Sequence, residues 1–317
     1  MRPIGKLAIA ALVLGGTGVA AMWFLSAPTR LGAEQLAALG TGDSVKGARV
    51  FWAGGCASCH ARPKSAGDAR LELAGGQQLK TPFGMFVPPN ISPDPDSGIG
   101  TWSPEDFANA MMRGVSPAGA HYYPAFPYTS YARMTPADVA DLYAFMKTLP
   151  AVEGKAPGHQ LGFPFNIRRG LGLWKRLYLS DRPVIGVAAD APERLVLGRY
   201  LVEGPGHCGE CHTPRAITGG PKKGQWLSGA PAAEGNGIVP NITSGEGGIG
   251  DWSEANIASY LETGFTPDFD TVGGAMADVQ KNIAQLTPED RAAIAVYLKS
   301  VPPHPNGYPA RQNAAQN

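Results

Sequence analysis

Apolar residues recur at helical spacing near the end of each half of the chain. The first stripe consists of Val139, Leu142, Tyr143 and Met146, and the second of Ile294, Tyr297 and Leu298. Residues three or four positions apart share one face of a helix, so each stripe predicts an amphipathic helix that packs on a core. A Thr-Pro pair with an acidic residue close behind precedes each stripe, at Thr135 and at Thr287. Threonine favours the N-cap and proline the first helical position, so both helices should begin there.

Four more helices are expected from similar signals. Two should lie over residues 44–53 and 192–203, and two should begin at Ser103 and Ser253, which are typical N-cap residues. The chain also has 42 glycines and 29 prolines, which favour short helices joined by long loops. The predicted fold class is therefore all-α.

The second half of the chain repeats the first at an offset of about 152 residues. The matched pairs include Cys56 with Cys208, Asn90 with Asn241, Trp102 with Trp252 and Gly114 with Gly264. Two copies of this length indicate a duplicated domain and not a solenoid. We predict domains at 40–150 and 191–305, joined by a connector at 151–190, after an N-terminal segment at 1–30 and before a loose tail at 306–317.

All four cysteines of the chain fall in two Cys-x-x-Cys-His motifs. The motifs are Cys56 to His60, which includes Cys59, and Cys208 to His212, which includes Cys211. This spacing is typical of c-type haem attachment, because two thiols on one helical turn can form thioethers to one porphyrin and the next histidine can bind its iron. The sequence therefore predicts two covalently bound haems. A four-cysteine zinc site, a redox-active Cys-x-x-Cys pair and disulfides are weaker alternatives.

Composition and charge exclude some functions. The hydrophobic fraction of 44% is enough to build a core, so the chain should not be disordered. Its formal net charge of +1 gives no electrostatic reason to bind nucleic acid. The charge also gives little indication of a docking face.

The N-terminus resembles an export segment. Arg2 and Lys6 precede an apolar run from Leu7 to about Leu25, which is long for a signal peptide and just long enough to span a bilayer. We expect an uncleaved anchor in the bacterial inner membrane, with the rest of the chain on the periplasmic side. A cleaved signal, which would leave a soluble periplasmic protein, is the alternative.

Together these motifs resemble the diheme class I cytochromes c that serve as electron-transfer subunits of periplasmic dehydrogenases. The resemblance covers about residues 40 to 305 and includes Pro-Asn-Ile and Gly-Ile-Gly-x-Trp-Ser in both copies and the run from His121 to Tyr128. It implies two tandem cytochrome c domains, each with a few short helices wrapped round one haem. It also implies that the first and last helices of each domain cross, with Gly47 facing Phe145 and Gly198 facing Tyr297.

The resemblance makes His60 and His212 iron ligands and suggests a methionine as the sixth ligand of each iron. In the second copy Met276 follows Gly273 and Gly274, where the family carries its axial methionine. In the first copy relatives carry a methionine where this chain has Phe126, and Met134 is the nearest candidate. His121 or a vacant iron remains an alternative there. Met111 and Met112 are expected in the core.

Each haem carries two anionic propionates, which need donors if they are partly buried. Asn90 and Asn241, and the indole N–H groups of Trp102 and Trp252, are candidates because both residue types recur at matched places. Turn formation by the asparagines and core packing by the tryptophans are the alternatives.

The function that we expect is electron transfer and not catalysis. A periplasmic dehydrogenase would be the donor, and a quinone, another cytochrome or an oxidase in the respiratory chain the acceptor. The competing hypothesis is a diheme redox enzyme, similar to a peroxidase or a thiosulfate dehydrogenase, with one open iron. The connector is basic and aromatic, so it could lie on a membrane or a partner, or pack between the domains with its charges in solvent.

Overall fold

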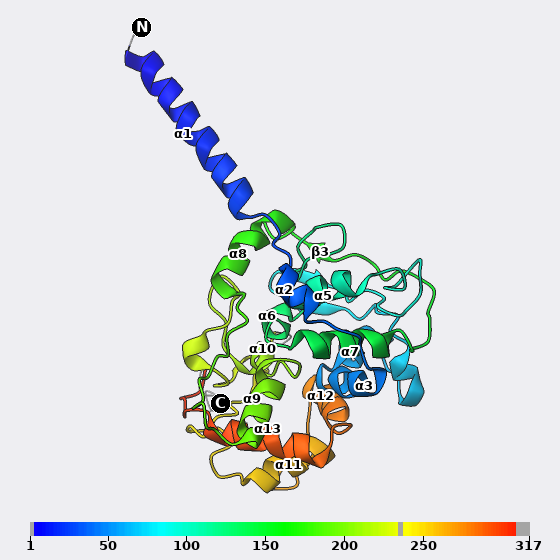
Figure 1. Cartoon of the computed structure of the whole chain (residues 1–317). Helices are drawn as coiled ribbons and strands as arrows, with labels where there is room; N and C mark the ends of the chain where they lie inside the picture. The colour runs from blue at the N-terminus through cyan, green and yellow to red at the C-terminus, as the bar shows by residue number, and fades with distance from the viewer. Residues whose placement is uncertain (1–2, 234–236, 309–317) are drawn as a thin grey trace, which may run out of the picture.

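The structure, a computed structural model, describes residues 3–233 and 237–308, with side chains from residue 12 onward. It is mostly helical, as Figure 1 shows. The helices in the first half are α1 (Pro3–Leu25), α2 (Ala33–Ala37), α3 (Ser44–Ala53), α4 (Cys56–His60), η1 (Gly67–Leu71), α5 (Pro104–Arg113), α6 (Tyr128–Tyr131) and α7 (Pro136–Met146). Those that follow are η2 (Arg168–Gly170), α8 (Leu171–Tyr178), α9 (Glu193–Glu203), α10 (Gly209–His212), η3 (Lys223–Gln225), α11 (Glu254–Thr263), α12 (Met276–Ile283) and α13 (Pro288–Ser300).

The few strands are two or three residues long. Strands β1 (Leu79–Thr81), β2 (Gly84–Phe86) and β3 (Gln160–Leu161) form one antiparallel sheet in the order β1-β2-β3, and β4 (Ala230–Pro231) pairs with β5 (Ile238–Val239). The expectation of an all-α fold agrees with this small strand content.

The predicted helix starts are confirmed. Ser103 and Ser253 accept hydrogen bonds from backbone N–H groups three residues later, as Thr135 and Thr287 do at α7 and α13. Helix α3 spans 44–53 as expected, and α9 begins at Glu193, one residue after the expected start. These starts were predictable because a capping side chain acts within one turn of its own helix.

Two helix crossings organise the molecule. Helix α3 packs on α7, and α9 packs on α13 (Figure 1). A Cβ atom on Gly47 would lie 1.9 Å from the carbonyl oxygen of Asp141 and 2.8 Å from Cβ of Phe145, and one on Gly198 would lie 1.9 Å from the carbonyl oxygen of Ala293. Both glycines are therefore the close-approach points that the family resemblance implied.

A hydrophobic cluster surrounds each crossing. The first cluster gathers residues between Leu31 and Leu149, including Met111, Met112 and Met134, and the second extends from Ala53 to Val301. Met111 and Met112 are buried, which confirms their expected place in the core. The repeat extends to polar contacts, since Lys147 donates to the carbonyl of Gly100 and Lys299 to that of Gly250.

The expected membrane anchor needs correction. Among the residues that the structure describes, no helix is long and apolar enough to cross a membrane. A span needs about 20 predominantly apolar residues, and Gly15, Gly16, Thr17 and Gly18 interrupt the apolar run of α1. Residues 1–2, and the side chains of residues 3–11, lie outside the described part.

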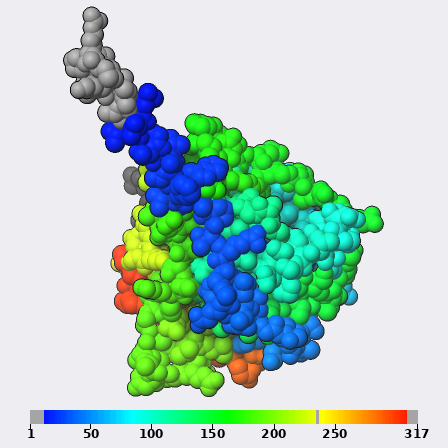
Figure 2. Space-filling model, turned by 45° about the horizontal axis from the view of Figure 1, so that its top comes forward, coloured from blue at the N-terminus to red at the C-terminus, as the bar shows by residue number. Residues whose placement is uncertain are grey.

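The connector contacts the C-terminal end of α1. Arg169 donates to the carbonyl of Trp23 at 2.6 Å and Arg176 to that of Leu25 at 2.7 Å. Figure 2 shows the N-terminal segment lying against the green surface of the connector. The last carbonyls of a helix lack partners within the helix, so the two arginines satisfy them. The connector is therefore packed within the molecule, and its charges are not simply solvated: Lys175 is buried.

The expected loose tail is held at its start. Asn241 donates to the side chain of Asn306 at 3.2 Å, and the N–H of Gly307 donates to the carbonyl of Ser228 at 2.8 Å. Residues 309–317 of the tail lie outside the described residues.

Candidate functional site

Each Cys-x-x-Cys-His motif ends on a histidine that is held in one orientation. His60 in α4 donates its Nδ1–H to the carbonyl of Pro89, and His212 in α10 donates its Nδ1–H to that of Pro240, both at 2.8 Å. A hydrogen bond at Nδ1 leaves Nε2 of the neutral ring as the metal-binding nitrogen. Burial lowers the pKa of both imidazoles, which favours the neutral form that binds metals. The sequence did not predict the two proline carbonyls as partners.

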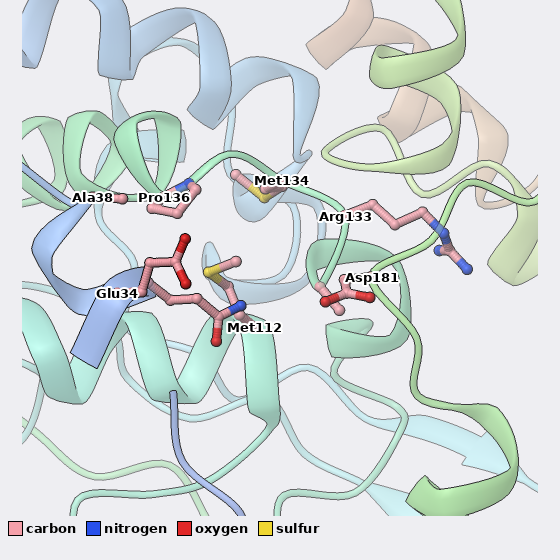
Figure 3. A pocket seen from close by; sticks show the side chains of 9 residues that line it. Glu34, Ala38, Met112, Arg133, Met134, Pro136 and Asp181 are labelled. Atoms are coloured by element: carbon pink, nitrogen blue, oxygen red, sulfur yellow. The ribbon is translucent and has the colours of Figure 1, made fainter. Parts of the chain in front are cut away.

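The first motif opens on a cavity that also contains Met134. The cavity is lined by Val50, Gly54, Cys56, Met111, Tyr131, Met134, Leu142 and Pro205. A second, more open pocket of about 440 Å³ also includes Met134, together with Met112 (Figure 3). Met134 is 3% exposed and lies in the turn just before α7. The structure thus brings a candidate attachment cysteine and a candidate iron ligand to one largely apolar space.

The cysteines are arranged as two separate pairs. Within the described part of the chain, no three residues of the types His, Cys, Asp and Glu are grouped so that they could hold a metal ion. The four-cysteine zinc alternative is therefore wrong. Burial raises the pKa of Cys56 and of Cys208 to about 12. Each of the two motifs supplies two thiols, which suits the covalent attachment of one haem at each motif.

Met276 is the first residue of α12. Its partly buried side chain packs against the second hydrophobic cluster, which Cys208 also contacts. This position, next to the second motif's own core, is compatible with the predicted iron ligand. The ligand role of Met276 stays a prediction, as does that of Met134.

His121 is directed away from the first motif. Its Nε2 lies 2.9 Å from the carbonyl of Ser26, and its Nδ1 is buried without a partner. Burial lowers the pKa of this imidazole. His121 does not line the cavity that Cys56 and Met134 share. Which residue would complete the first iron site stays a prediction.

The two asparagines hold loops. Asn90 donates to the carbonyls of Val152 and Gly154, and Asn241 donates to the carbonyl of His304 and accepts from Thr243. These bonds match the alternative of turn formation. Trp102 and Trp252 are partly buried against the first and second clusters. The propionate role of all four residues stays a prediction.

One carbonyl joins the two motifs. Gly54, two residues before Cys56, accepts hydrogen bonds from Nε2–H of His207 and from the hydroxyl of Tyr131, each at 3.2 Å. His207 directly precedes Cys208, and its ring packs edge-on against Tyr131 with centroids 5.6 Å apart. A side-chain-to-backbone hydrogen bond therefore links the residue just before the second motif to the chain just before the first. His207 gives no signal in the sequence, because it is not part of the repeat.

Residues inside the motifs make further contacts between the halves. Ser58 accepts a hydrogen bond from Asn282 of α12 at 2.5 Å. Glu210 accepts hydrogen bonds from Thr129 at 2.6 Å and Ser130 at 2.8 Å, both in α6. Arg215 forms an ion pair with Glu210 at 2.6 Å.

Glu210 stays ionised although it is largely buried. Burial alone would raise its pKa, but Arg215 and the hydroxyls of Thr129 and Ser130 outweigh burial and hold the pKa below its ordinary value. A carboxylate at a variable position of the motif gives no signal in the sequence, so Glu210 was also missed.

Comparisons with known proteins place these features in a family. The cytochrome c family model matches residues 44–150. A protein of Cereibacter sphaeroides named diheme cytochrome c-type is 54% identical over 285 residues, which are 90% of this chain and 94% of that protein. The chain belongs to the diheme c-type cytochromes. The resemblance drawn from the sequence is thus confirmed.

Other relatives of this cytochrome are named as subunits of dehydrogenases. It is 36% identical to the fructose dehydrogenase cytochrome subunit of Gluconobacter japonicus, over 95% of this chain and 60% of that one. It is also 36% identical to the cytochrome c subunit of a quinone-dependent alcohol dehydrogenase of Gluconobacter oxydans, over 82% of this chain and 55% of that one. This cytochrome thus spans just over half of these two relatives. The names agree with an electron carrier and not with a catalytic subunit.

Proposed function

We propose that this cytochrome carries electrons from a periplasmic dehydrogenase toward the respiratory chain through two covalently bound haems. The observation that carries the proposal is the repeated geometry of the motifs, in which each histidine donates Nδ1–H to a proline carbonyl at 2.8 Å. The family membership and the subunit names of the relatives support the donor class. A quinone, another cytochrome or an oxidase would be the acceptor.

The residues of each half fit one haem. Cys56 and Cys59 would form the thioethers of the first haem, and Cys208 and Cys211 those of the second. His60 and His212 would bind the irons through Nε2, since their Nδ1 atoms are occupied by proline carbonyls. A bound haem supplies a reversible one-electron change at its iron. The two tandem cytochrome c domains, at 40–150 and 191–305, belong to this proposal.

Met134 and Met276 would complete the two sites. A thioether ligand raises the reduction potential relative to a second histidine and fills the position that a small substrate would need. Met134 is supported by its burial in the cavity that Cys56 lines. A carrier with two filled irons has no open site for catalysis, so this arrangement favours the carrier over the diheme enzyme.

The contacts between the halves suit transfer in series. The bond from the His207 side chain to the Gly54 carbonyl connects a residue next to Cys208 with one two positions before Cys56. The bond from Asn282 to Ser58 ties helix α12, which begins at Met276, to the first motif. These contacts fix the distance between the two attachment sites.

The test begins with the oxidised protein as purified, whose haem content and near-infrared spectrum are measured together. We expect two haems for each chain and a methionine-to-iron charge-transfer band with the intensity of two sites. Replacing both cysteines of one motif by alanine should remove one haem. One haem in the parent protein, or a band with the intensity of one site, would contradict the two-haem or the two-methionine part of the proposal.

Function is tested with a sugar or alcohol dehydrogenase as donor and ferricyanide as acceptor. The cytochrome should be reduced by the dehydrogenase in the presence of substrate and reoxidised by ferricyanide. It should oxidise no substrate by itself. Substrate turnover without the dehydrogenase would refute the carrier function.

A further inference from the structure

The two halves contain equivalent loops with different surroundings. The first loop, residues 114–122, follows α5, and the second loop, residues 264–272, follows α11. Each contains one β-bridge, between Val115 and His121 in the first loop and between Phe265 and Thr271 in the second. Their closing bonds also match, from the N–H of residue 122 to the carbonyl of residue 114 at 2.7 Å and from residue 272 to residue 264 at 2.8 Å. The two loops therefore share one backbone structure in two different settings.

The first loop is covered by basic parts of the same chain. Arg30 donates to the carbonyl of Pro117 at 2.8 Å, Arg168 to that of His121 at 3.1 Å and Lys175 to that of Gly114 at 2.7 Å. Val115 is only 1% exposed beneath this cover. Three cations thus satisfy carbonyls around an apolar centre.

The second loop lacks such a cover. Phe265, the equivalent of Val115, is 52% exposed, and Phe269 is 87% exposed. Asp268 and Asp270 are exposed beside them. Within the described part of the chain, no cationic side chain donates to a carbonyl of this loop. The loop therefore presents two aromatic rings, acidic side chains and backbone acceptors to solvent.

Phe269 occupies a backbone conformation that disfavours it. Its φ is 62°, and the equivalent residue of the first loop is Gly119, with φ 78°. A left-handed conformation is unfavourable for a residue with a Cβ atom and costs glycine little. The stability of the fold would thus favour glycine here, and burial gives the ring no compensating stabilisation. A partner that buries the ring would account for it.

The position of the second loop suits an external partner. Helix α11 lies at the end of the molecule opposite to α1, so the N-terminal segment does not cover it (Figure 1). The second loop also leads through Gly273 and Gly274 into Met276, the candidate iron ligand. A partner on this loop would lie beside the second haem site.

We propose that the second loop is a docking surface for a redox partner protein. The matching surface of that partner has an apolar patch surrounded by arginine or lysine side chains. The precedent is within the molecule, since the chain's own basic segments cover the first loop in this way. The partner's cations complement Asp268 and Asp270 and the loop carbonyls, and its apolar centre covers Phe265 and Phe269. The proposal rests on the electron-carrier function.

The test uses a small basic monohaem cytochrome c as the probe and the full-length haem-loaded protein. The dissociation constant is measured by NMR titration and the second-order electron-transfer rate by stopped flow. Phe269→Gly should keep or raise the melting temperature, because it relieves the left-handed phenylalanine, yet it should weaken binding by about tenfold. The matched control is Ile217→Ser, which removes a fully exposed apolar side chain from a loop held against Trp174 and Tyr178 of the connector.

Charge reversal tests the acidic part. Asp268→Lys combined with Asp270→Lys should lower the electron-transfer rate at low ionic strength by about tenfold and flatten its salt dependence. If the Phe269→Gly protein and the charge-reversed protein both match the parent within about twofold, or if the parent does not bind the basic probe, the docking surface is refuted. A parent that reduces ferricyanide in those cases still supports the carrier function, whereas one that reduces neither acceptor refutes that function itself.

Discussion

Adding one methyl group at the crossing of α3 and α7 should destabilise the protein. A Cβ atom on Gly47 would lie 1.9 Å from the carbonyl oxygen of Asp141. That oxygen belongs to the backbone of α7, so it cannot turn away as a flexible side chain could. Gly47→Ala therefore requires the two helices to move apart.

The size of the effect follows from the distances. Ordinary contact begins at 3.4 Å, so the helices must separate by about 1.5 Å along this direction. A gap of even 0.5–1 Å already loses about a quarter to a half of the dispersion attraction across a contact. Overpacking in a core costs about 1–3 kcal/mol, and alanine's better helix propensity returns up to about 1 kcal/mol. The overlap of about 1.5 Å puts the cost at the upper end of that range, so we expect a net loss of about 2 kcal/mol, or a melting temperature lower by about 4–8 °C.

The assay is thermal unfolding of the haem-loaded protein, followed by circular dichroism and by haem absorption. Gly198→Ala should behave similarly, since its Cβ atom would lie 1.9 Å from the carbonyl oxygen of Ala293. Gly224→Ala is the control, because no atom lies within 4 Å of a Cβ atom there. A Gly47→Ala protein that melts within about 1 °C of the parent would show that the crossing tolerates a side chain and that the reasoning is wrong.

Three other substitutions test the sites and the pH response. Met134→Ala should halve the near-infrared methionine band and lower one of the two reduction potentials, which redox titration measures. A band of unchanged intensity would show that Met134 is not an iron ligand. His207→Asn, which tolerates the positive φ of 41° but does not reach Gly54, should slow electron transfer between the haems several-fold in flash photolysis, whereas His304→Asn should not. His159 accepts a backbone N–H through Nδ1, and burial lowers its pKa, so its stabilisation is complete above the ordinary value of 6.5 and is lost as pH falls toward the lowered value. Between pH 7 and 5, the melting temperature of His159→Asn should fall less than that of the parent. Identical pH profiles of the two proteins would refute this role of His159.

Local signals explain why much of the fold was predictable. The N-caps Ser103, Ser253, Thr135 and Thr287 act within one helical turn, so the sequence alone locates the starts of α5, α11, α7 and α13. The haem attachment motifs are also local, because their chemistry requires fixed spacing. Gly47 and Gly198 depended on the family resemblance, which supplied the helix crossing that their own neighbours in the chain do not reveal.

The contacts that sequence reasoning missed join residues far apart in the chain. The bond from His207 to Gly54 spans 153 positions, and the bond from Asn282 to Ser58 spans 224. No periodicity or spacing encodes such a pair. The burial of Lys175 in the connector has the same cause, since the carbonyls of Arg113 and Gly114, 62 and 61 positions away, accept its hydrogen bonds.

The polar character of the contact between the halves fits a carrier with two sites. Glu203 is 2% exposed, accepts hydrogen bonds from the N–H groups of Val184 and Ile185, and lies 4.0 Å from Arg133 of the other half. An apolar contact of the same size could be as stable, but it could slide, whereas a buried carboxylate keeps all its donors in one arrangement only. Transfer between two sites depends on their separation, so a contact with a single register suits two haems that work in series.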